Sequence, residues 1–133
     1  MSHPGNNSFG KDERIVSRKL IETLFSGGKS KSLAAFPLRA VYMLTERHAD
    51  MAPVQIMVSV PKRHFKRAVK RNRVKRQVRE SYRLAKRPLV EAMANHEGMT
   101  LAVTFIWQAD HLYETRQVAD VMGNILGRLI ERL

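Results

Sequence analysis

Cysteine is absent from this chain of 133 residues. Its absence excludes a disulfide scaffold, a cysteine-based zinc site and a thiol nucleophile. Long apolar runs are absent as well, because stretches such as Leu101–Trp107 fall far short of the roughly 20 residues that span a bilayer. The first ten residues have neither the positive n-region nor the apolar h-region of a signal peptide. These absences predict a cytoplasmic protein in a reducing compartment, without membrane association.

Acidic residues are scarce in one segment, and this scarcity is the most informative feature of the sequence. Residues Lys62–Arg87 hold 13 of the 24 lysines and arginines but one acid, Glu80, which leaves a net +12, the net charge of the whole chain. A solvated surface helix is the simplest explanation for this charge. Like charges at this density repel one another, however, and one acid does not compensate them. A polyanion is their natural neutraliser.

Apolar periodicity predicts one small α+β domain. Alternation with period two indicates strands, and spacing of three or four residues indicates helices. The expected strands are Phe36–Thr45, Val54–Val60 and Met99–Trp107, the last of them central because it is almost wholly apolar. The expected helices are Ser17–Phe25, Phe65–Lys86 and Glu114–Arg132, with a short turn at Pro88–Asn95. The order α-β-β-α-β-α indicates a sandwich with helices over one small sheet.

Glycine and proline mark several boundaries. Residues 1–10 are polar and rich in turn formers, which predicts a flexible arm before a single domain at 11–133. Gly27 and Gly28 should stop the first helix, which Ser17 should cap. Pro37 lacks an N–H, so it should confine the start of its strand to an edge or a bulge. Two glycines four residues apart in the last helix, at positions 123 and 127, predict close contact between that helix and the sheet.

The basic helix has two different faces. At 100° per residue, one narrow stripe is apolar and comprises Val74, Val78, Tyr82 and Ala85. The opposite stripe is polar and comprises Asn72, Arg76, Arg79 and Arg83. Near the N-terminal end, basic residues lie over the apolar stripe, so that end should project past the core. Arginine predominates and suits bidentate phosphate contact. A strand-rich domain with one basic helix, lacking dimerisation heptads, favours RNA over DNA.

Other candidate sites are weak. The five histidines are scattered and lack the spacing of zinc ligands, so no metal site is predicted. The acids are isolated or adjacent and do not form the spaced set that a two-metal nuclease requires. Glu80 should pair with Arg76 one turn earlier, and Trp107 should lie in the core. We therefore expect no catalytic residue in this chain.

The segments Val58–Arg63 and Ala68–Glu80 resemble the signature of the bacterial ribonuclease P protein subunit. In that family a strand ends in a Val-Ser-Lys-Lys-like run, and a helix then carries Arg-Asn-Arg-x-Lys-Arg-x-x-Arg-Glu, which is intact here from Arg71 to Glu80. The resemblance extends over most of the chain, with only the first ten residues and Pro88–Gly98 outside it. It implies a ribosomal-protein-S5-domain-2-like sandwich of order α-β-β-β-α-β-α, whose extra strand would fall near Lys29–Ser32. The basic helix would lie in a left-handed crossover between parallel strands.

The resemblance also implies a function. The chain would be an accessory subunit that helps a catalytic RNA remove the 5′ leader from precursor tRNA, while the RNA subunit, with Mg²⁺, carries the chemistry. No further protein partner would be required. A structural ribosomal protein and a protein-only nuclease are the alternatives; the first leaves the intact motif unexplained, and the second predicts Mg²⁺-dependent cleavage by the chain alone.

Carried onto this sequence, the resemblance assigns two sets of residues. The catalytic RNA would be bound by Lys62, Arg63, Arg67, Lys70, Arg71, Asn72, Arg73, Lys75, Arg76, Arg79 and Arg83. A cleft between the first helix and the sheet would bind the single-stranded leader through Arg14, Ile21, Phe25, Phe36 and Arg39. Three departures from the family pattern lie in or near these sets. Ile21 stands where an aromatic residue is frequent, Arg39 stands where some relatives have tyrosine, and the linker 63–68 lacks its usual glycine.

Overall fold

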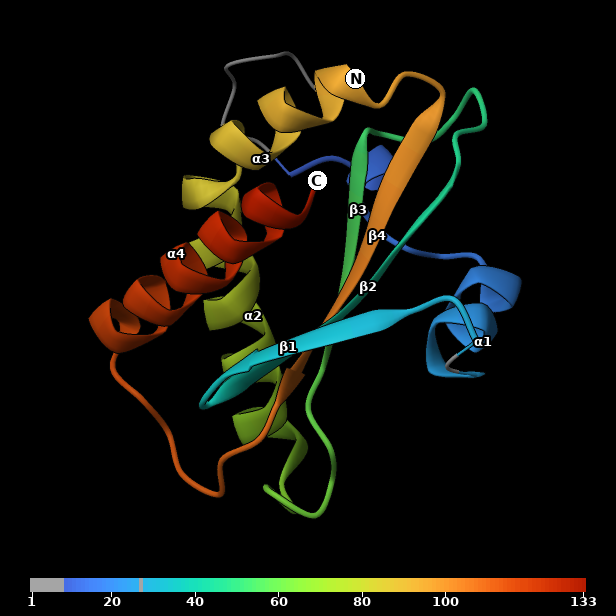
Figure 1. Cartoon of the computed structure of the whole chain (residues 1–133). Helices are drawn as coiled ribbons and strands as arrows, with labels where there is room; N and C mark the ends of the chain where they lie inside the picture. The colour runs from blue at the N-terminus through green and yellow to red at the C-terminus, as the bar shows by residue number, and fades with distance from the viewer. Residues whose placement is uncertain (1–8, 27) are drawn as a thin grey trace.

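The computed structural model describes residues 9–26 and 28–133 of the chain, which form a four-stranded sheet covered by helices (Figure 1). Most of the predicted flexible arm therefore lies outside the described residues. The main elements, in chain order, are α1 (Arg18–Ser26), β1 (Lys31–Ala35), β2 (Leu38–Glu46), β3 (Val54–Ser59), α2 (Ala68–Ala85), α3 (Arg87–Ala92), β4 (Met99–Trp107) and α4 (Thr115–Arg132). Short 3-10 helices lie at Lys11–Glu13 and Met93–Asn95. This order confirms the predicted α+β class, including the additional strand implied by the resemblance.

The sheet has the strand order β1-β2-β4-β3. Its β1–β2 and β2–β4 pairs are antiparallel, whereas β3 and β4 run parallel and are joined through α2. The predicted central position of β4 is confirmed. The prediction for Pro37 is wrong in part, because β2 pairs on both sides and is not an edge strand. Pro37 instead lies in the turn between β1 and β2, and β2 begins one residue later, at Leu38.

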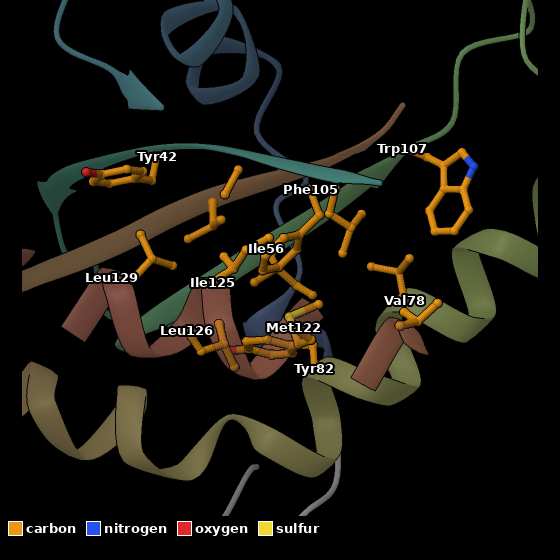
Figure 2. Packing of buried hydrophobic residues seen from close by; sticks show 14 of the residues in the cluster. Tyr42, Ile56, Val78, Tyr82, Phe105, Trp107, Met122, Ile125, Leu126 and Leu129 are labelled. Carbon is orange, nitrogen blue, oxygen red and sulfur yellow. The ribbon is translucent and has the colours of Figure 1, made fainter. Parts of the chain in front are cut away.

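Helices cover both faces of the sheet. On one face α2 lies against β3 and α4 lies against β1 and β2, and the main core fills the space between them (Figures 1 and 2). Val74, Val78 and Tyr82 of α2 are fully buried there, which confirms the predicted apolar stripe, and the Tyr82 and Phe105 rings lie 6.0 Å apart. Burying an apolar side chain of this size contributes about 1.5–3 kcal/mol relative to leaving it exposed.

The opposite face of the sheet carries α1. Met43 of β2 and Ala102 of β4 are directly paired neighbours whose side chains point away from the main core. Together with Ile15 and Leu24 they form a second, smaller core cluster under α1. The Ser17 hydroxyl accepts a hydrogen bond from the Leu20 N–H at 3.2 Å, so the predicted cap of α1 is confirmed.

The last helix differs from expectation at its glycines. Both Gly123 and Gly127 lie on the exposed side of α4, and a Cβ placed on either would meet no atom of the described residues within 4 Å. Close helix–sheet contact therefore does not explain them. The buried stripe of α4 consists of Val118, Met122, Ile125, Leu126 and Leu129. Across the described residues, no helix combines the length and apolar character needed to cross a membrane.

Candidate nucleic-acid interface

Helix α2 holds seven basic residues and one acid, and most of the basic ones point away from the sheet. Its docked stripe leaves Lys70, Asn72, Arg73 and Arg76 exposed. The N-terminal turn is exposed on several sides, and even Val69 has 79% of its surface accessible. This agrees with a helix end that extends beyond the core. Such an array of outward cations provides a surface for a phosphate backbone.

Arg71 and Arg83 of α2 form contacts within the protein. Arg71 donates from Nη1 to the backbone carbonyls of Phe65 and Lys66, at 2.8 Å each, so it fixes the preceding linker. Arg83 forms a bidentate ion pair with Glu80, at 2.6 and 3.0 Å. The predicted pairing of Glu80 with Arg76 is therefore wrong. The hydrogen bond from Arg83 holds the pKa of the Glu80 carboxyl below its usual value.

The linker before α2 is anchored even though it lacks the family's glycine. Phe65 is buried, and His64 places Nδ1 2.5 Å from the Asp110 carboxylate in the loop after β4. With the contacts from Arg71, these anchors hold the linker at three points. The side chains of Lys62, Arg63 and Arg67 are exposed and extend the basic surface of α2.

The C-terminal end of α2 has a different electrostatic environment. Lys86, just after the helix, pairs with Glu13 at 2.5 Å, and both side chains are about 95% buried. The second oxygen of Glu13 accepts the Gly10 N–H at 2.8 Å, which ties the segment before α1 to α2. Burial, together with the nearby negative charge of Glu13, raises the pKa of Tyr82 far above its usual value. The Tyr82 hydroxyl is therefore protonated at any physiological pH.

A second candidate surface lies on the α1 side of the sheet. The register aligns Arg39, Ile106 and Ser59 in one row across β2, β4 and β3, and α1 leaves this row partly uncovered. A hollow of about 360 Å³ lies at its β1–β2 end, between Phe25 of α1 and Arg39. Phe25 is 51% exposed, and Arg39 donates to the Ser32 hydroxyl at 3.2 Å. An aromatic ring and a cation thus border one groove.

The five residues predicted for the leader cleft are not all together. Phe25 and Arg39 share the hollow, whereas Ile21 is half-buried against the small cluster under α1. Phe36 lies in the β1–β2 turn, with its ring centroid 6.4 Å from that of Tyr113. Arg14 lines a separate hollow, beside Lys75 and Arg79 of α2.

Sequence reasoning missed several residues that the fold brings to these hollows. Lys31 and Ile106 line the groove beside Phe25, and Phe9 lines the hollow beside Arg14. The alternation of β4 could have indicated Ile106, because its neighbours Phe105 and Trp107 face the main core. No local signal marks Phe9, since it falls in the segment predicted to be flexible.

The comparisons with known proteins agree on one family. The family model described as Ribonuclease P matches residues 9–121. The ribonuclease P protein component of Porphyromonas gingivalis is 39% identical over 129 residues, which cover 97% of this chain and 91% of that protein.

Solved structures show the same fold. The ribonuclease P protein of Thermotoga maritima superimposes with a TM-score of 0.63 at 20% identity, over 87% of this chain and 96% of that one. A Staphylococcus aureus ribonuclease P protein, described as a mutant with defective mRNA degradation activity, gives a TM-score of 0.62 at 18% identity, over 90% and 89% of the two chains. The family match, the close relative and the intact motif on the exposed side of α2 lead to one conclusion: this chain belongs to the ribonuclease P protein family.

Proposed function

We propose that this chain binds the catalytic RNA of ribonuclease P through α2 and the linker before it, and thereby promotes removal of the 5′ leader from precursor tRNA. The observation that carries the proposal is the uncompensated charge of α2, which projects outward from a helix whose opposite stripe is fully buried. Neutralising several phosphates with such a surface releases counterions and makes binding strongly dependent on salt. The chain would act in the cytoplasm and would need no protein partner.

We place the chemistry, with its Mg²⁺, in the RNA subunit. Two ion pairs support this division, because Glu80 of α2 pairs with Arg83, and Glu13 pairs with Lys86 just after α2. Among the described residues, no three histidine or acidic side chains gather as metal ligands would. The role of this chain would be to position the two RNAs and offset their charge.

The groove between Phe25 and Arg39 is our candidate for the leader site. An exposed aromatic ring can stack on an unpaired base, and an arginine beside it can contact the adjoining phosphate. Ile21, on the same helix as Phe25, would hold that helix in place, because it packs against the small core cluster under α1. Phe36, at the adjacent turn, would extend the surface away from the hollow.

Reconstitution tests the proposal. The purified chain, the catalytic RNA and a leader-bearing precursor tRNA are combined at low Mg²⁺, and cleavage is followed with and without protein. We expect the protein to accelerate cleavage, and the chain without RNA to cleave nothing. Unchanged cleavage on adding the protein would refute the assignment. Cleavage by the protein alone would move the chemistry into this chain.

The leader site has its own measurement. Phe25→Ala should narrow the affinity difference between leader-bearing and mature tRNA by about tenfold, since stacking on one base contributes about 1–3 kcal/mol. Leu44→Ala, which trims another partly exposed apolar residue outside the groove, serves as the control. An equal loss of affinity for both tRNAs would exclude the groove as the leader site.

A further inference from the structure

The second hollow, at the outer edge of β3, has features that neither the basic helix nor the leader groove explains. It has a volume of about 240 Å³ and is built from three separate segments of the chain. The segment before α1 contributes Phe9 and Arg14, β3 contributes Ile56 and Val58, and α2 contributes Lys75 and Arg79. Together the segments bring an aromatic ring, three cations and the edge of a strand to one place.

Three cations surround this hollow. Arg14 is exposed, whereas Lys75 and Arg79 are half-buried, and Arg79 is held by a 3.3 Å hydrogen bond from its Nε to the Lys75 carbonyl. Within residues 9–26 and 28–133, none of the three forms a salt bridge with an acid. Three positive charges around a small concavity favour a phosphate group.

One wall of the hollow is aromatic and fixed in position. The rings of Phe9 and the buried Tyr82 pack in a T-shaped arrangement, with centroids 6.1 Å apart and an interplanar angle of 82°. The Arg14 guanidinium carbon lies 5.2 Å from the Phe9 centroid. The guanidinium lies over one face of this ring, so the ring and the guanidinium together provide a planar surface on which a nucleobase can stack.

The floor of the hollow offers hydrogen bonds from the backbone. The Ile15 N–H donates to the Ile56 carbonyl at 3.0 Å on the outer side of β3, and a single parallel bridge joins Arg14 and Ile56 there. Along a strand the direction of the backbone groups alternates, so Val58 directs its N–H and C=O to this same outer side. Because β3 is the last strand of the sheet, Val58 presents one donor and one acceptor at the hollow.

We infer that this hollow binds one unstacked nucleotide of RNA, with its base against Phe9 and the edge of Val58 and its phosphate among Arg14, Lys75 and Arg79. The inference rests on the proposed function and adds a defined subsite to it. It also separates Arg14 from the leader groove and joins it to the α2 surface. The nucleotide belongs to the catalytic RNA or to the leader. Both offer the same base and phosphate chemistry, and the experiments below distinguish them.

The test measures binding of the chain to the catalytic RNA without tRNA, over a series of salt concentrations. Phe9→Leu keeps apolar bulk but removes the ring, so affinity should fall about tenfold at every salt concentration with an unchanged salt slope. Arg14→Gln removes a phosphate contact, so the slope of log K against log salt should decrease by about 1. Lys11→Gln removes the same charge from an exposed residue outside the hollow and is the matched control.

Titration with adenosine 5′-monophosphate provides a second measurement on the unmodified chain. In amide NMR spectra, the nucleotide should shift the Val58 N–H in a saturable manner, and inorganic phosphate should not. Thermal unfolding of Phe9→Leu verifies that the variant still folds after it has lost the ring contact with Tyr82. Phe9→Leu and Arg14→Gln could instead leave binding to the catalytic RNA unchanged and lower only the preference for leader-bearing over mature tRNA. That result would keep the subsite and assign its nucleotide to the leader.

Two results would overturn the inference while leaving the proposed function intact. One is wild-type RNA affinity in Phe9→Leu, together with no nucleotide-specific shift at Val58. The other is an equal change of salt slope in Arg14→Gln and Lys11→Gln, which would reduce the hollow to general surface charge. Failure of the unmodified chain to bind the catalytic RNA would instead refute the proposed function itself.

Discussion

Helices α2 and α4 each have 18 residues and pack against the same face of the same sheet, yet they use their charges in opposite ways. The arginines of α4 near its C-terminal end form hydrogen bonds to the sheet: Arg128 donates to the Ala34 carbonyl at 2.8 Å, and Arg132 donates to the Tyr42 hydroxyl at 2.9 Å. On α2, by contrast, Lys70, Arg73 and Arg76 are exposed to solvent. A helix is therefore recognised as a nucleic-acid surface by charge that the fold leaves uncompensated, and not by its arginines alone.

The largest effect on stability is expected at the buried ion pair just after α2, which Lys86 forms with Glu13. Lys86→Ala would leave the Glu13 carboxylate buried without its cation, so the free energy of unfolding should fall by about 3–5 kcal/mol. Urea denaturation measures this. Lys70→Ala, at the exposed end of α2, should change stability by no more than about 0.5 kcal/mol. Similar losses in the two variants would mean that Lys86 and Glu13 are not isolated from water.

A pair of double variants tests the contrast between the helices directly. Arg73→Gln/Arg76→Gln and Arg128→Gln/Arg132→Gln each remove two charges, one pair from α2 and the other from α4. The α2 variant should lower the salt slope of RNA binding by about 2 and leave stability unchanged. The α4 variant should lose about 1–3 kcal/mol of stability, because hydrogen bonds from charged donors would be lost, and should keep its salt slope.

The contrast between α2 and α4 would be contradicted if the two double variants changed RNA binding alike. Equal changes in salt slope would show that net charge alone governs RNA binding, and that the outward face of α2 is not a defined interface. Both properties are therefore measured on every variant, by denaturation for stability and by a salt series for binding.

The glycines of α4 offer a smaller, stabilising change. Gly123→Ala and Gly127→Ala add a methyl group in open space, so each should stabilise the protein by up to about 1 kcal/mol through helix propensity. RNA binding should not change, because α4 is not part of the basic surface. Denaturation of the single variants decides this, and a destabilised Gly123→Ala would contradict the open surroundings of this glycine.

Strong periodicity made most of the fold predictable. The apolar stripe of α2 and the central position of β4 follow from residues that are close in sequence. The placement of α1 did not follow, because β2 and β4 are apolar on both sides. Alternation assigns Tyr42 and Met43 to opposite faces but cannot tell which helix covers each face.

For the candidate sites too, arrangements that are local in the sequence could be predicted, and arrangements of distant segments could not. The basic surface is local, so its residues could be named from the motif alone, whereas the hollow beside β3 joins Phe9, Val58 and Lys75, which lie far apart in the sequence. The partner of Glu80 was ambiguous for another reason. On a helix, residues three and four positions away are both neighbours, and side-chain geometry selects between them. Here it selects Arg83.

The smallest expected effect concerns the choice of Arg83 over Arg76 as the partner of Glu80, which is the single acid of α2. Its pKa is lowered by the hydrogen bond from Arg83, so the ion pair stabilises the fold above the usual pKa of a glutamate and loses its effect as the pH falls through the lowered value. At neutral pH the pair is fully formed. NMR titration of the Glu80 carboxyl should therefore show a pKa that returns toward the ordinary value in Arg83→Gln and stays low in Arg76→Gln. The reverse outcome would restore the pairing with Arg76 that spacing alone suggested, and would return Arg83 to the outward surface of α2.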